Sequence, residues 1–139
     1  MPRLTRWYLR SSLIYLVVAL FIGLILAARP ILGLPPSVAN LRSAFFHLFV
    51  VGWITQLIFG VVYWMFPKYS SEAPYRSVTL AWVTFIFLNI GLLARAVIEP
   101  ALNMIAAPIW GQLLALSALL HLIAGVTFAI NSWSRVKVR

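Results

Sequence analysis

The sequence predicts an all-α integral membrane protein, an up-down bundle of four helices with both termini in the cytoplasm. Three observations lead to this fold class: the composition, four long apolar runs and the distribution of the basic residues. The chain of 139 residues is 63% hydrophobic and only 9% charged, with a mean hydropathy of +1.00. Soluble domains are about 45–50% apolar and about 25% charged. This composition therefore excludes a soluble enzyme, a disordered tail and a nucleic-acid binder.

Four apolar runs are long enough to be membrane spans, since a spanning helix needs about 20 mostly apolar residues. They cover residues 13–28, 43–66, 78–98 and 109–130. The first run is short and follows a basic start, as in a secretory signal peptide. Because it ends without a small-x-small cleavage site, we expect it to be retained as a span. No repeat or linker divides the sequence, so we expect residues 1–139 to form one domain.

Proline and glycine mark the connections between the spans, at residues 33–36, 67–74 and 100–108. Proline lacks the amide donor that the interior of a helix needs, so we expect the helices to end at these positions. Ser37 is a candidate N-terminal cap for a second helix that begins before its apolar run.

The basic residues predict the orientation. Eleven Lys and Arg against two Asp and Glu give a formal net charge of +9. They lie in the gaps between apolar runs, which is typical of topology signals. One side has eight: Arg3, Arg6, Arg10, Lys68, Arg76, Arg135, Lys137 and Arg139; the other has Arg29, Arg42 and Arg95. Basic residues stay cytoplasmic, so we expect both termini to face the cytoplasm across the inner membrane of a bacterium or archaeon. Four spans with short connections predict an up-down bundle.

Missing residue types exclude several kinds of chemistry. The chain has no cysteine, which excludes disulfides, iron–sulfur clusters and covalently attached heme. Its two acidic residues, Glu72 and Glu99, both lie at or near expected loops. They are too few for a carboxylate di-iron site, a proton pump or an acidic channel ring, and no Asp exists for a Ser-His-Asp triad. Glu99 follows Arg95 by four residues, so we expect an ion pair at the outer rim.

His47 and His121 are the residues inside the spans with the strongest claim to a function. An ionisable side chain in the bilayer is costly and marks a candidate site. A neutral imidazole can be an axial ligand of heme iron, and two helices of a bundle can supply two such ligands. A stripe of small residues, Gly111, Ala118 and Gly125, passes His121. It either leaves room for a flat macrocycle or lets helices pack closely.

Arg42 and Arg95 are candidate partners for the anionic propionates of a heme. Both lie toward the outer side of their spans, in the same layer as His47. The alternative is that these arginines extend to lipid headgroups.

The segment LRSAFFHLFVVGW, residues 41–53, and its continuation to Pro67-Lys68 resemble the second helix of heme–copper oxidase and nitric oxide reductase catalytic subunits. Short four-helix relatives of that subunit are more similar still, with a His…Gly-Trp…Phe-Gly…Tyr…Pro pattern. The resemblance implies that His47 is an axial ligand of a low-spin heme, with Arg42 near the heme edge. The chain lacks the histidine cluster for copper and high-spin heme, and Phe45 stands where many short relatives have a second histidine. We therefore expect no oxygen or nitric oxide reduction by this chain alone.

Together these observations predict a b-type heme protein for electron transfer, in which His47 and His121 bind the heme iron and Arg42 and Arg95 lie nearby. We assign no catalytic residue and expect a redox protein or a subunit of a respiratory oxidoreductase. Its expected partners are the lipid bilayer, further copies or a larger membrane complex, and a quinone or redox protein. The alternatives are a cofactor-free structural subunit, an oligomeric channel or transporter, and a copper site with an incomplete ligand shell. One histidine or two could bind the heme.

Overall fold

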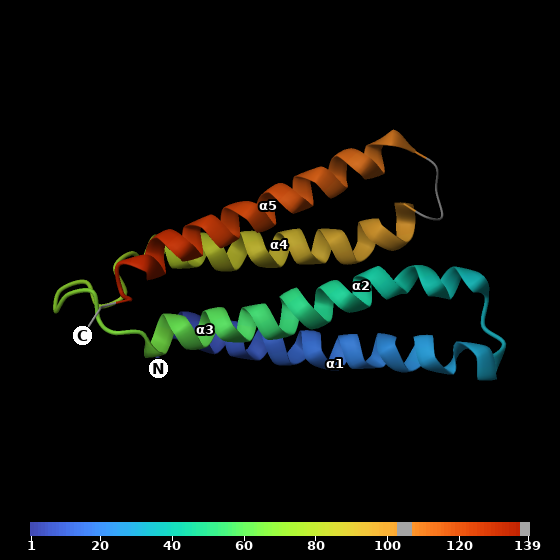
Figure 1. Ribbon diagram of the computed structural model, residues 1–139, viewed down its shortest axis with the longest axis horizontal. Helices are drawn as coiled ribbons and strands as arrows, with labels where there is room; N and C mark the ends of the chain where they lie inside the picture. The colour runs from blue at the N-terminus through green and yellow to red at the C-terminus, as the bar shows by residue number, and fades with distance from the viewer. Residues whose placement is uncertain (103–106, 137–139) are drawn as a thin grey trace.

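The computed structural model describes residues 1–102 and 107–136, and all regular structure in these residues is helical (Figure 1). The elements are α1 (Arg3–Leu32), η1 (Pro36–Asn40), α2 (Leu41–His47), η2 (Leu48–Thr55), α3 (Gln56–Met65), α4 (Val78–Leu102) and α5 (Pro108–Trp133). The segments from η1 to α3 follow one another without a break, and we call them together the second rod. Each of the four resulting helices is long and apolar enough to cross a membrane. The expectation of an all-helical chain with four candidate spans is thus confirmed.

The helices are longer than the apolar runs that predicted them. α1 begins at Arg3 and passes through Pro30 before it ends at Gly33, whose φ of 62° is left-handed. α4 likewise passes through Pro100, where the sequence predicted a boundary. A proline in the last turns of a helix removes one hydrogen bond without ending it. Ser37 lies inside η1, and no side-chain hydrogen bond caps either η1 or α2, so the predicted cap is wrong.

The second rod changes its hydrogen-bonding pattern directly after His47. The segment η2 is a π-helix, which is rare and often found at functional sites. Within it Gly52 is buried at the level where α1 and α4 both approach. A Cβ atom on Gly52 would lie 2.9 Å from Tyr15 of α1 and 2.9 Å from Leu92 of α4. The absence of a side chain at Gly52 therefore lets three helices meet here.

α1 packs antiparallel along the second rod. Along α1 the contacts pass from Tyr8 to Gly23, and along the second rod they pass back from Gly60 to Phe45. A Cβ atom on Gly60 would lie 2.6 Å from the Cβ of Tyr8, so only glycine allows this approach. Figure 1 shows that α1 lies on the outside of this pair.

α4 and α5 form the other antiparallel pair. Side-chain hydroxyl groups connect the two helices. The Oγ1 atoms of Thr84 and Thr127 lie 2.8 Å apart, and Ser117 Oγ donates to the Gly91 carbonyl at 2.8 Å. α4 also packs against α2 and η2, so it lies between α5 and the second rod (Figure 1). These interhelical contacts build the region in which both histidines lie.

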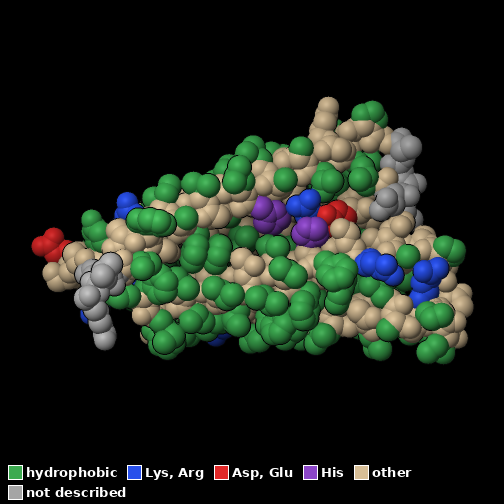
Figure 2. Space-filling model, viewed as in Figure 1, with side chains coloured by type: hydrophobic (Ala, Val, Ile, Leu, Met, Phe, Trp, Pro, Cys, Tyr) green, Lys and Arg blue, Asp and Glu red, His purple; other side chains and the backbone are tan. Residues whose placement is uncertain are grey.

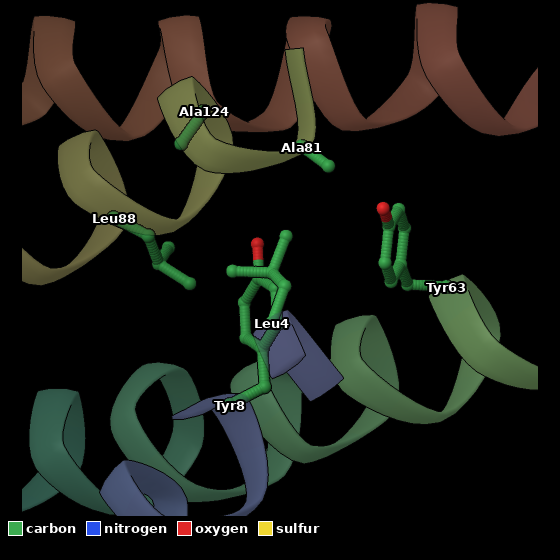
Figure 3. Packing of buried hydrophobic residues seen from close by; sticks show 6 residues of the cluster. All are labelled: Leu4, Tyr8, Tyr63, Ala81, Leu88 and Ala124. Carbon is green, nitrogen blue, oxygen red and sulfur yellow. The ribbon is translucent and has the colours of Figure 1, made fainter. Parts of the chain in front are cut away.

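One hydrophobic cluster draws on all four helices at the end of the bundle where α1 begins. Its buried members are Leu4, Tyr8, Tyr63, Ala81, Leu88 and Ala124 (Figure 3). Outside such clusters, large apolar side chains are mostly exposed, as Ile31 is to 85% and Trp133 to 82%. An apolar exterior of this kind is the surface that lipid requires.

Arg135 joins the segment after α5 to the end of α3. The residue is 1% exposed, and its guanidinium donates to the carbonyls of Tyr63 at 3.0 Å, Phe66 at 2.8 Å and Pro67 at 3.1 Å. It also lies over the rings of Tyr63 and Tyr75, at 5.9 and 5.7 Å from their centroids. The last carbonyls of a helix have no partner within it, and a cation there also favours the helix dipole. Arg135, which the sequence suggested only as an orientation signal, is thus the C-terminal cap of α3.

We expect Arg135→Ala to lower the free energy of unfolding by about 2–4 kcal/mol, because it leaves buried carbonyls without donors. Unfolding of the purified protein by sodium dodecyl sulfate, followed by circular dichroism, measures this change. Lys68→Ala removes an exposed charge from the same end of the bundle and is the control. Equal stability of the two variants would contradict the capping role.

Candidate functional site

Both histidines line one cavity of about 290 Å³ formed by the second rod, α4 and α5. Its lining residues are His47, Val51, Thr55, Phe59, Leu88, Arg95, His121 and Gly125. Figure 2 shows the two imidazoles (purple) in a hollow of the surface, with a basic and an acidic side chain beside them. We call this cavity the histidine groove. It brings together three of the four candidate cofactor-binding residues: His47, Arg95 and His121.

His47 ends α2, and its Nδ1 atom has two oxygen neighbours. The Ser43 carbonyl oxygen lies 3.0 Å away, and Oε2 of Glu99 lies 3.1 Å away. A carbonyl and a carboxylate only accept hydrogen bonds, so Nδ1 is the ring nitrogen that carries the hydrogen. In the neutral imidazole the lone pair is then on Nε2. Histidines that bind metals have this arrangement, with the non-ligating N–H held by a carboxylate or a carbonyl.

Glu99 is the carboxylate that connects α4 to His47. Its Oε1 accepts from Arg95 Nε at 2.6 Å, so the expected ion pair is confirmed. The side chain is only 9% exposed, however, because α4 continues past the end of the apolar run to Leu102. The sequence reading missed the contact between Glu99 and His47. The four-residue spacing of Arg95 and Glu99 predicted only the ion pair between them. The distance from Glu99 to His47 depends on how α2 packs on α4, which the spacing does not specify.

His121 lies in α5 against Gly91 of α4. A Cβ atom on Gly91 would be 3.2 Å from Cε1 and 3.3 Å from Nδ1 of the imidazole, so glycine leaves the room that the ring occupies. Both ring nitrogens of His121 are buried without a side-chain partner among the described residues, and the backbone of Ser117, one turn earlier, is the group that interacts with the ring. An unpaired polar group in an apolar setting costs free energy, and a ligand at the ring would remove that cost.

The three small residues near His121 do not all lie on the same surface. Gly125 lines the histidine groove, whereas Gly111 and Ala118 are exposed. No atom lies within 4 Å of a Cβ built on Gly111 or on Gly125, so neither is a point of close helix packing. The tight contact between α4 and α5 is made at Gly91 instead.

Arg42 lies outside the histidine groove. It lines a separate pocket between α1 and α2, with Gly23, Leu26, Phe45 and Phe46. The two candidate arginines are therefore not brought together, and Arg95 is the one beside the histidines.

Phe59 of α3 stacks on Phe128 of α5, with ring centroids 3.7 Å apart and an angle of 3° between the planes. Phe59 also lines the groove, so this stack joins its two walls. Counted along the helices, His47 is further from the stack than His121 is. The two imidazoles are therefore staggered along the groove, as Figure 2 also shows.

The histidine groove offers few metal-binding atoms, which suits a metal that obtains its other ligands from a cofactor. In residues 1–102 and 107–136, no group of three or more His, Cys, Asp and Glu side chains could hold a metal ion. Heme iron needs only one or two axial ligands from the protein, and imidazole is a common one. The Nε2 lone pair of His47 and a ring nitrogen of His121 are donors of that kind.

No family model, no curated protein and no solved structure matches the chain. The resemblance noted for residues 41–68 therefore stays a prediction.

We expect Glu99→Ala to lower the free energy of unfolding by about 3–5 kcal/mol, because it leaves the partly buried Arg95 without its counter-charge. The measurement is unfolding of the purified protein by sodium dodecyl sulfate. Glu72→Ala, which removes the exposed acidic residue, is the matched control and should unfold like the parent protein. If the two variants are equally stable, the carboxylate of Glu99 does not stabilise the bundle through its pair with Arg95.

Proposed function

We propose that the chain is a membrane-embedded b-type heme protein that transfers electrons, with His47 and His121 as axial ligands of the heme iron. One observation carries the proposal: two histidines from different helices line one groove, and each keeps a ring nitrogen available to a ligand. The resemblance of residues 41–68 to a heme-binding helix agrees with it. The proposal assigns no catalytic residue, so the chain acts as a redox protein or a subunit of an oxidoreductase.

The residues around the groove have separate roles in this proposal. The Ser43 carbonyl and Glu99 hold the His47 ring and keep the hydrogen on Nδ1, and the carboxylate makes the imidazole a stronger donor at Nε2. Arg95 pairs with Glu99 through Nε and offers its remaining guanidinium N–H groups to a propionate at the same end of the groove. Val51, Phe59 and Leu88 provide an apolar wall that keeps water away. Bound heme supplies the one-electron chemistry itself.

The proposed setting is the cytoplasmic membrane of a bacterium or archaeon, with the helices crossing up and down and both termini inside. The eight basic residues on one side of the sequence support this orientation. The histidines reach the surface of the bundle in a hollow (Figure 2), and a quinone or a second membrane subunit could approach there. Arg42 lines its own pocket beside α1. Its proposed contact is therefore with lipid headgroups or with a partner protein, and not with a heme in the histidine groove.

Absorption spectroscopy tests the proposal directly. Protein purified from cells with ample heme should have a Soret band that sharpens after dithionite reduction, together with split visible bands. A preparation of the double variant His47→Ala/His121→Ala, at equal protein concentration, is the control and should lack them. A colourless parent protein would reject heme binding.

The single variants His47→Ala and His121→Ala should each abolish or change the low-spin spectrum, because each removes one axial ligand. Asn89→Ala is the matched control, since Asn89 is a polar residue of α4 that bonds Tyr15 at 2.8 Å outside the groove. Its spectrum should equal that of the parent protein. A histidine variant with an unchanged spectrum would remove that histidine from the site.

A second candidate function is a structural subunit without a cofactor. The contact of His47 with Glu99 favours it, because this contact already connects α2 to α4 without any ligand. In that case the protein is colourless at every heme supply, and His47→Ala affects stability alone.

A further inference from the structure

Three arginines and a tryptophan form an exposed patch at the start of α1. Arg3, Arg6, Trp7 and Arg10 line a pocket of about 310 Å³ that the histidine groove does not include. Their spacing of three, four and seven residues puts them on one face of the helix. We call this surface the arginine patch.

The opposite face of the same turns is fixed in the bundle. Leu4, Thr5 and Tyr8 are 3%, 0% and 2% exposed, and the Tyr8 ring meets Phe85 of α4 edge to face at 4.9 Å. Gly60 of α3 lies directly against Tyr8. This packing holds the backbone of the first turns in place, so the arginine patch is presented outward at a fixed position.

The patch has no counter-charge within the described residues. The sequence contains two acidic residues. Glu99 is bound to Arg95 and His47 in the histidine groove, and Glu72 forms no ion pair with Arg3, Arg6 or Arg10. Three guanidinium groups within about two turns repel one another, so an anion from outside the chain would stabilise them.

The length of α1 indicates where the patch lies in a membrane. Thirty residues extend about 45 Å, whereas the hydrocarbon core is about 30 Å thick. The uncharged stretch of residues 11–28 is about 27 Å long and is bounded by Arg10 and Arg29. The arginine patch therefore lies at the level of the lipid headgroups. Trp7, which is 57% exposed, is typical of that interface.

We propose that the arginine patch binds the phosphate of an anionic phospholipid, a phosphodiester lipid with a net negative charge. The planar guanidinium of arginine matches two phosphate oxygens, and three such groups can surround one headgroup. The ring of Trp7 packs against the glycerol and upper acyl carbons. This site is independent of heme binding and of the histidine groove.

The test is native mass spectrometry of the full-length protein in detergent, titrated with phosphatidylglycerol or with phosphatidylcholine. We expect phosphatidylglycerol to bind more tightly, and Arg6→Gln to weaken it about 5-fold, since one basic residue near an anionic surface contributes about that factor. The triple variant Arg3→Gln/Arg6→Gln/Arg10→Gln should lose about 100-fold on the same scale. Because these side chains are exposed, circular dichroism and gel filtration should remain those of the parent protein.

Arg29→Gln is the matched control, because it removes one charge from the other end of α1. It should leave binding unchanged. Equal binding of the two lipids, equal effects of Arg6→Gln and Arg29→Gln, or full affinity in the triple variant would each overturn the proposal. Displacement of the lipid by millimolar inorganic phosphate would also overturn it, because the site would then be one for free phosphate.

Discussion

Hydrocarbon offers no hydrogen-bond partner, so polar side chains inside a membrane bundle must find partners in other parts of the chain. This constraint shapes the four helices. Tyr15 donates to Asn89 at 2.8 Å between α1 and α4, and Ser117 donates to the Gly91 carbonyl between α5 and α4. Gln56 likewise donates to Ser11 between α3 and α1. Each contact satisfies a polar group and at the same time fixes how two helices lie against each other.

The histidine groove departs from this pattern, as do the buried atoms Thr5 Oγ1 and Gln56 Oε1, which have no hydrogen-bond partner among the described residues. His47 uses one nitrogen for a carbonyl and a carboxylate, and the two buried nitrogens of His121 have no side-chain partner among the described residues. Gly91 provides the space for the His121 ring, and the π-helix begins directly after His47. Irregular backbone and unused polar atoms together make this region costly for stability alone. A bound ligand would explain why both features occur in one place.

Local sequence rules predicted some features well and missed others. Apolar length indicated all four helices, and the four-residue spacing of Arg95 and Glu99 correctly predicted their ion pair. The helix boundary expected at Pro100 was wrong, because this proline lies in the last turn of α4, which tolerates the lost hydrogen bond. Arg135 was read only as a topology signal, since its three carbonyl partners are far from it in the sequence.

The sequence by itself determined the class of protein, the four helices and the two histidines that merit attention, because hydropathy and residue type act locally. The tertiary structure alone decided which side chains meet. It separated Arg42 from the groove and brought Glu99 to His47. It also put Gly91 rather than the stripe of Gly111 and Gly125 at the closest approach of α4 and α5. The physical reason is that such meetings depend on the rotation and offset of packed helices, which small residues and interhelical hydrogen bonds set cooperatively.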